Sequence, residues 1–345
     1  MTADTDALLT IHDLVRWGAC RFADTRLYFG HGTDNAFDEA VWLVASALRM
    51  PLERMDAYRD SHVTADERAA VLALLQRRIS ERRPAAYLTG RAWFAGLEFI
   101  VDDTVLIPRS PLAELIKDGF APWFDPELSD PDRIGRALDL CAGSGCLGIA
   151  MAAYMPNLDV DLADISPAAL RVAARNRALH GLEDRVSLIE SDLFAGIAQV
   201  GSPSISGLHS QHRPDPNPGP KPGPDPDRYS EQGYDIIVSN PPYVGAEEME
   251  SLPAEYRHEP RLALAAGETG LDLVLRILRD APDYLGDDGL LVVEVGNTAG
   301  RLQQRFPEVP FTWLDFEHGG EGVFLLTREQ LVEHHPRFSQ ALADL

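Results

Sequence analysis

The sequence predicts an α/β domain that is built on a seven-stranded, mostly parallel sheet and preceded by a small helical domain and a β-hairpin. Three observations carry this prediction. Apolar residues recur at helical spacing within residues 5–82. From Arg136 onward, strand-like and helix-like patterns alternate, which is typical of βαβ units. Residues 236–238 form a continuous Ile-Ile-Val run, the pattern of a strand that is covered on both faces of a parallel sheet.

The composition is that of a globular protein, with 345 residues of which 45% are hydrophobic. This length allows two or three domains. No apolar run reaches the roughly 18 residues that a membrane helix needs, and the N-terminus lacks the basic and apolar stretches of a signal peptide. We therefore expect a cytoplasmic protein without a membrane partner. The three cysteines show no spacing typical of zinc ligands, so we expect neither a metal site nor a disulfide framework.

The charge balance narrows the choice of partner. The chain has 31 Lys and Arg residues against 54 Asp and Glu residues, a formal net charge of −23. Binding to a phosphate backbone depends on basic residues that displace counterions, so we expect no direct nucleic-acid partner. A basic protein would instead be attracted to this chain.

Residues 1–90 are expected to form the helical domain. The first predicted helix covers residues 5–24. A second should begin at Thr33 or Asp34 as N-cap and end before Pro51. A third is expected at 64–82, opened by a capping box between Thr64 and Glu67. Basic residues in its last turn, Arg77, Arg78, Arg82 and Arg83, suit the C-terminal end of a helix better than a ligand site.

Residues 91–124 are interpreted as a hairpin and a connector. The pattern within 92–101 predicts two short strands that turn at Ala95-Gly96. A helix at about 111–120 should follow.

Residues 125–345 are interpreted as the α/β domain. Its seven strands are expected at 137–141, 160–164, 185–192, from 234, 289–295, 311–316 and 322–327. Its helices are expected from 147, from Ser166-Pro167, at 271–285 and at 298–305. The last two strands are joined so tightly that they should be antiparallel. The proline-rich stretch 201–229 is predicted to be a flexible insertion before the strand at 234.

A glycine-rich turn after the first strand of this domain predicts a cofactor site. Its residues are Cys141, Ala142, Gly143, Ser144 and Gly145. Glycines at this point let the backbone approach a ligand closely at the start of a helix. No phosphate-binding lysine follows and no third glycine completes a dinucleotide fingerprint, so a phosphate-bearing cofactor fits poorly.

Acidic residues at the ends of three strands extend this predicted site. Asp164 follows Gly143 by 21 residues, the spacing at which a carboxylate reaches ribose hydroxyls; its alternative role is the N-cap of the next helix. Asp192 suits an adenine amino group, and Asp139 precedes the glycine turn. We include Ile165 and Leu193 in the predicted cofactor site, because they directly follow Asp164 and Asp192. Carboxylates without basic neighbours favour a cationic adenosine cofactor, S-adenosylmethionine.

The sequence Asn240-Pro-Pro-Tyr243 predicts the site of reaction. Pro241 and Pro242 lack an N–H and fix the backbone, so this turn presents acceptors and few donors. The Asn240 side-chain oxygen and the Pro241 carbonyl could accept both hydrogens of a planar NH₂ group, with Tyr243 against its plane. A turn without function at the end of a strand is the alternative.

These motifs together resemble a known family. Asp139 to Cys146, Asp164, Asp192 and Asn240 to Tyr243 are similar to the motifs of class I, Rossmann-like S-adenosylmethionine methyltransferases that modify amide or exocyclic amine nitrogens. Tyr87-Leu-Thr-Gly90, the hairpin and Ile107-Pro-Arg109 resemble the protein-glutamine methyltransferases, which place a small helical domain before the catalytic one. The sequences 29–35 and 109–115 look like the branch that acts on ribosomal protein three of the large subunit.

The resemblance implies transfer of a methyl group to a glutamine side-chain nitrogen of that basic ribosomal protein. Asn240, Pro241 and Tyr243 would bind the glutamine, and Arg109 and the helical domain would hold the surrounding protein. Three alternatives stay open: methylation of a class I peptide-chain release factor, methylation of an exocyclic amine in nucleic acid, and a non-catalytic assembly factor that keeps the fold.

Overall fold

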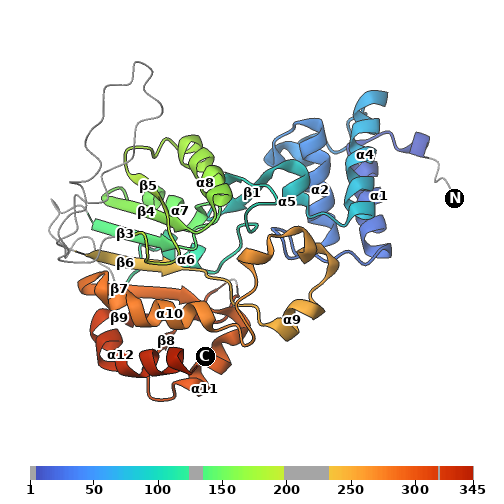
Figure 1. The fold of residues 1–345 in the computed structure, drawn as a ribbon. Coiled ribbons are helices and arrows are strands. Elements are labelled where there is room, and N and C mark those ends of the chain that lie inside the picture. Colours follow the sequence, from blue (N-terminus) through green and yellow to red (C-terminus); the bar gives the residue numbers. More distant parts are fainter. Residues whose placement is uncertain (1–4, 124–134, 198–232, 318, 345) are drawn as a thin grey trace.

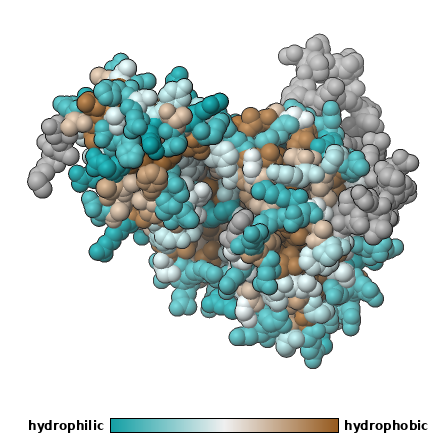
Figure 2. Space-filling view, turned by 180° about the vertical axis from the view of Figure 1, so that it is seen from behind, coloured by the Kyte–Doolittle hydropathy of each residue, from teal (hydrophilic) through white to brown (hydrophobic). Residues whose placement is uncertain are grey.

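The computed structural model describes residues 5–123, 135–197, 233–317 and 319–344. A helical unit, residues 5–90, stands beside an α/β unit that is coloured from green to red (Figure 1). Hydrophilic residues cover most of both units when they are seen from behind, and hydrophobic residues show between them (Figure 2). The predicted flexible insertion at 201–229 lies outside the described residues. Within the described ranges, no helix has both the length and the apolar character needed to cross a membrane.

Five helices form the helical unit around a shared apolar core. Leu14, Leu43 and Leu75 are completely buried in it, and Val172 of the α/β unit packs into the same cluster. Because one core includes side chains from both units, the two units are packed together and not merely tethered. The helices are α1 (Ile11–Asp24), α2 (Ala36–Leu48), α3 (Met55–Tyr58), α4 (Ala65–Glu81) and α5 (Ala85–Thr89).

The helix starts in this unit follow the side chains that can cap them. The predicted capping box of Thr64 and Glu67 is confirmed at α4. The prediction of Thr33 or Asp34 as the cap of α2 was wrong, because the Asn35 side chain accepts the backbone N–H groups of Phe37 and Asp38. The first helix begins later than predicted, at Ile11, because Thr10 and Asp13 form a capping box there.

The hairpin lies where it was predicted. Its strands, β1 (Arg91–Phe94) and β2 (Leu97–Ile100), pair antiparallel about Ala95 and Gly96. Both turn residues have positive φ, 51° and 83°, as a two-residue type I′ turn requires. The helix that follows, α6 (Leu112–Lys117), is shorter than the predicted span of 111–120.

The seven predicted strands form one sheet in the order β5-β4-β3-β6-β7-β9-β8, which confirms the predicted fold class. Neighbours from β5 to β7 are parallel, whereas β9 is antiparallel to both β7 and β8. The last strand pair is therefore antiparallel, as predicted, although β8 has only two residues. The strands are β3 (Gly135–Leu140), β4 (Leu158–Asp164), β5 (Val186–Glu190), β6 (Tyr234–Ser239), β7 (Leu285–Glu294), β8 (Thr312–Trp313) and β9 (Val323–Thr327).

Helices cover both faces of this sheet. Ile236 and Val238 of β6 pack toward α6 and α7, whereas Ile237 between them packs toward α10 and α12. The run 236–238 is therefore a strand buried on both faces. The helices of the α/β unit after α6 are α7 (Cys146–Tyr154), α8 (Pro167–Leu179), α9 (Ala246–Ser251), α10 (Asp272–Asp280), α11 (Ala299–Arg305) and α12 (Arg328–Ala343). Our reading of the sequence assigned no element to α12, which includes Pro336.

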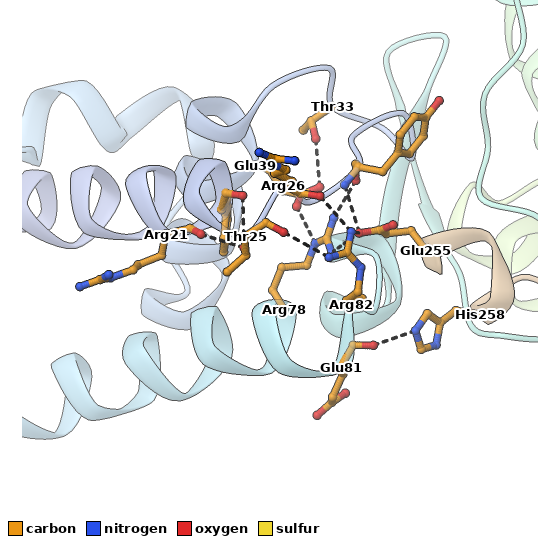
Figure 3. A network of polar contacts seen from close by, with 12 residues as sticks. Arg21, Thr25, Arg26, Thr33, Glu39, Arg78, Glu81, Arg82, Glu255 and His258 are labelled. Atoms are coloured by element: carbon orange, nitrogen blue, oxygen red, sulfur yellow. Dashed lines mark hydrogen bonds and ion pairs between the residues drawn. The ribbon is translucent and has the colours of Figure 1, made fainter. Parts of the chain in front are cut away.

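A buried network of charged side chains joins the two units (Figure 3). Glu255 lies in the segment between α9 and α10. Its carboxylate is 2.7 Å from Arg82 and 3.7 Å from Arg78, and it accepts the backbone N–H of Tyr28. Arg78 is also bonded to Glu39 at 2.6 Å, deep in the helical unit. Arg78 therefore has a second role that the prediction from its place at a helix C-terminus did not include.

Candidate active site

The predicted site residues collect along one edge of the sheet, where the parallel strands end. The glycine turn (residues 141–145) follows β3, and Asp164 closes β4. Asp192 and Leu193 come just after β5. The Asn-Pro-Pro-Tyr sequence at 240–243, hereafter the reaction turn, follows β6 directly. Ligands bind at this edge in open α/β sheets because a crevice forms outside the carboxyl ends of the strands where the strand order reverses.

A large cavity of about 300 Å³ lies at this edge. It is lined in part by glycine-turn residues, by acids and the residues that follow them, and by the reaction turn. The predicted residues on its wall are Cys141, Gly143, Asp164, Ile165, Asp192, Leu193, Asn240 and Pro242. Its electrostatic character is set by the two carboxylates and by Arg276, which is paired with Asp192 at 3.0 Å.

Four residues that we predicted to contact the cofactor do not line this cavity: Asp139, Ala142, Ser144 and Gly145. Asp139 alternates along β3 with Leu138 and Leu140, so its side chain turns toward α7 on the other face of the strand. There it is completely buried and accepts the backbone N–H of Gly148 at 2.9 Å. Burial raises its pKa to about 7, and this hydrogen bond opposes the rise. Asp139 thus holds the start of α7 beneath the glycine turn.

Asp164 organises the loops that form the cavity. One carboxylate oxygen accepts the backbone N–H of Gly143 and the other that of Ser166, both at 2.8 Å. The cap of α8 is Ser166, whose hydroxyl accepts the N–H of Ala169, so Asp164 is not the N-cap that we considered as its alternative role. Burial raises the pKa of Asp164, and the two backbone hydrogen bonds oppose the rise.

The backbone at the cavity wall is strained at two non-glycine positions. Cys141 has a φ of 59° and Leu193 a φ of 51°, a region that side chains with a Cβ rarely adopt. Both residues face the large cavity. Such strain persists where the surroundings impose it, and it concentrates at functional sites.

A small cavity of about 100 Å³ adjoins the large one. Its wall includes Arg109, Pro241 and Tyr243, which we predicted to bind the substrate. Asn240, Leu106 and Ala263 line both cavities, so the two meet at these side chains. The structure therefore brings the predicted cofactor and substrate residues together at Asn240.

Arg109 is already neutralised by a carboxylate. Two of its nitrogens bond to Glu259 at 2.5 and 2.7 Å, and its guanidinium lies 5.4 Å from the ring centre of Tyr256. Burial alone would raise the pKa of Glu259, but the charge and hydrogen bonds of Arg109 lower it to about 2. His31 of the helical unit lies 3.5 Å from the same carboxylate. Arg109 thus builds the cavity wall, together with the segment between α9 and α10.

Reading the sequence missed Glu259 and a second acid, Glu294, at the end of β7. Glu294 is buried, accepts a hydrogen bond from the Ser110 hydroxyl at 2.6 Å and lies beside Tyr243. The pattern that predicted Asp164, an acidic residue at the end of a buried strand, would also have identified Glu294. Nothing in the local sequence singles out Glu259.

Two family models match the chain. The PrmC N-terminal domain matches residues 13–90, and the methyltransferase small domain matches residues 126–201. The relatives cover almost the whole chain. A ribosomal protein uL3 glutamine methyltransferase from Xanthomonas campestris is 46% identical over 98% of this chain and 97% of its own. A protein of the same name from Bordetella pertussis is 44% identical over 94% of this chain and 97% of its own.

The chain belongs to the ribosomal protein uL3 glutamine methyltransferase family. This confirms both the family and the branch that the sequence motifs resemble, and with them the methyltransferase class of enzyme. Similarity to solved structures is weaker. The hMettl16 catalytic domain, in complex with MAT2A 3'UTR hairpin 6, aligns with 76% of this chain and 81% of its own, at a TM-score of 0.44 and 14% identity.

Proposed function

We propose that this enzyme transfers a methyl group from S-adenosylmethionine to the side-chain nitrogen of a glutamine in ribosomal protein uL3. The observation that carries the proposal is the position of Asn240 on the walls of both cavities. The methyl donor, S-adenosylmethionine, in the large cavity and the glutamine amide in the small cavity would meet at the Asn240 side chain. The names of the relatives support uL3 as the substrate.

The large cavity fits the donor by its charge. Asp164 and Asp192 place carboxylates on its wall, and Arg276, which also lines it, is paired with Asp192. A sulfonium cation with an uncharged adenosine suits this wall, whereas a phosphate would be repelled. We assign the donor to the cavity-lining residues Cys141, Gly143, Asp164, Ile165, Asp192 and Leu193. Replacing Asp164 with alanine should weaken S-adenosylmethionine binding in a calorimetric titration, and unchanged affinity would rule this assignment out.

The reaction turn would hold the glutamine by both amide hydrogens. The Asn240 Oδ1 and the Pro241 carbonyl accept them, while Tyr243 borders the same cavity. The amide nitrogen forms the new N–C bond as the C–S bond of the donor breaks, the electron pair of that bond stays on sulfur, and the nitrogen releases one proton. Two fixed acceptors favour this step because they stabilise the positive charge that develops on the nitrogen. They also fix its direction of attack.

We assign recognition of the protein substrate to the helical domain, residues 1–90, and methyl transfer to the α/β domain, residues 125–345. Residues 91–124 would form the hairpin and connector between them. The net charge of −23 favours a basic ribosomal protein over nucleic acid. The same charge argument favours uL3 that is not yet covered by ribosomal RNA, and we place this reaction in the cytoplasm.

The test offers the purified enzyme three substrates with labelled S-adenosylmethionine: uL3, a class I release factor and single-stranded nucleic acid. We expect one added methyl group on one glutamine of uL3, located by mass spectrometry of its peptides. Faster transfer to the release factor or to nucleic acid would overturn the substrate assignment. Absence of transfer to all three, with donor binding intact, would favour a non-catalytic assembly factor.

A further inference from the structure

We propose that Glu294 is a positioning residue that turns the Asn240 side chain so that Oδ1, and not Nδ2, faces the amide to be methylated. This inference rests on the proposed function. It addresses a requirement of the reaction turn, because an asparagine amide has an acceptor at one end and donors at the other. Only one of its two orientations can accept a hydrogen from a substrate NH₂ group.

The sheet places the two residues side by side. Ser239 of β6 pairs with Val293 of β7 in parallel register. Glu294 is the next and last residue of β7, and Asn240 is the first residue after β6. The Asn240 side-chain amide faces the Glu294 carboxylate and acts on its pKa as a hydrogen-bond donor does, lowering it. Glu294 itself lines neither cavity, so it contacts the reacting groups only through its neighbours.

The remaining partners of Glu294 also donate to it. The Ser110 hydroxyl donates to Oε2 at 2.6 Å, and the Tyr243 hydroxyl lies 3.4 Å from Oε1. None of the ion pairs among the described residues includes Glu294; the charged and titratable groups that face it are Arg109 and Tyr243. A carboxylate in this setting only accepts hydrogen bonds. Asn240 must therefore point Nδ2 toward Glu294, which leaves Oδ1 free for the cavity.

Protonation of Glu294 would remove this control. Burial raises the pKa of Glu294 to about 7, and the hydrogen bonds from Ser110, Tyr243 and Asn240 oppose the rise. A protonated carboxyl group has an O–H donor and can bond to Asn240 Oδ1, so both orientations of the amide become possible. Activity should therefore increase as the pH rises through the pKa of Glu294, because only the charged form selects the productive orientation.

The first test compares Glu294→Gln with the parent enzyme and with Glu190→Gln, a matched change of an exposed acid at the end of β5. We expect Glu294→Gln to lower kcat for uL3 by about 10- to 100-fold at pH 8, the range typical of residues that orient a reacting group. Donor affinity should stay close to that of the parent, and the increase of kcat between pH 6 and 8 should disappear. Glu190→Gln should retain both kcat and its pH profile.

A softer variant guards against misfolding of Glu294→Gln. Ser110→Ala removes one donor to the carboxylate, so the pKa of Glu294 should rise and the acid limb of the kcat profile should move to higher pH. A role of Glu294 in packing alone would leave the limb in place. Parent-like kcat and an unchanged acid limb in Glu294→Gln would overturn the proposal.

A measurement without uL3 separates this proposal from the proposed function. The Asn240 NH₂ resonances, assigned by their loss in Asn240→Asp, should shift between pH 6 and 8 in the parent and stay fixed in Glu294→Gln. Resonances that do not respond in the parent would refute the orientation by Glu294. If the parent methylates no uL3 but these resonances respond as expected, only the proposed substrate reaction fails.

Discussion

The carboxylate of Glu255 accepts the backbone N–H of Tyr28 at 3.1 Å. Tyr28 belongs to the helical unit, whereas Glu255 immediately precedes Tyr256, which lines the small cavity. The same carboxylate is paired with Arg78 and Arg82 of α4. One buried side chain therefore fixes part of the small cavity to the helical unit.

We expect Glu255→Gln to lower the free energy of unfolding by about 3 kcal/mol, because a buried ion pair that loses one partner leaves the other charge uncompensated. Cleavage near residues 254–260 in limited proteolysis should also become faster. Urea unfolding gives the free energy. Asp56→Asn, which removes an exposed ion pair with Arg59, is the control and should change little. Equal effects of the two substitutions would contradict a structural role for the buried network.

We expect Asn240→Ala to reduce kcat by about 100- to 1,000-fold, the loss typical when one preorganised hydrogen-bonding group is removed from a reacting site. Donor affinity, measured by calorimetry, should change far less. Asn35→Ala serves as the control because it removes the N-cap of α2, and Asn35 lines neither cavity. It should lower stability by about 1 kcal/mol with kcat unchanged. A parent-like kcat in Asn240→Ala would exclude the proposed hold on the amide.

The glycine turn offers a matched pair of substitutions. Gly143 and Gly145 both have positive φ, 55° and 78°. A Cβ at Gly145 would lie 2.9 Å from Leu162 and 3.0 Å from Ile149, whereas a Cβ at Gly143 would meet no atom within 4 Å. We expect Gly145→Ala to lower the free energy of unfolding by about 2–4 kcal/mol, from overpacking and a left-handed backbone, and Gly143→Ala by about 1 kcal/mol. Gly143→Ala should instead weaken donor binding, because Gly143 is on the cavity wall. Urea unfolding and calorimetry measure the two effects, and a reversed order of stability would contradict this geometry.

The pairing of Glu259 with Arg109 predicts a pH-dependent contribution to stability. The pKa of Glu259 is about 2, below the ordinary value of 4.5. Its contribution to the stability of the folded state is therefore fully present above about pH 4.5 and is lost as the pH falls toward 2. The shift corresponds to about 3 kcal/mol. We expect Glu259→Gln to be less stable than the parent by this amount at pH 7, with the difference shrinking below pH 4.5. Thermal unfolding at several pH values tests this. Glu247→Gln, an exposed acid on α9, should show a small difference at every pH.

Local patterns were sufficient to predict the fold and the turns of the site. The apolar run at 236–238 and the two prolines after Asn240 each determine their own backbone, so the strand and the reaction turn could be predicted without knowledge of the rest of the chain. The backbone of the glycine turn could be predicted in the same way, from its own glycine residues.

Side-chain direction and distant pairing could not be predicted from such patterns. Asp139 and Asp164 both belong to the ends of neighbouring strands, yet the alternation along β3 sends Asp139 beneath the turn. Glu255 meets a partner 227 residues away, a separation at which no sequence spacing is informative. Strand β8 is shorter than its apolar pattern suggests.

The three cysteine thiols differ in reactivity, so one of them can be labelled selectively with a dye without mutagenesis. Cys20, on α1, is exposed. Burial raises the pKa of Cys141, and that of Cys146 to about 12, so both stay protonated near neutral pH and react slowly. A maleimide dye will therefore label the helical unit at one position. Fluorescence anisotropy of that dye can follow the arrival of a protein substrate in real time, before any chemistry takes place.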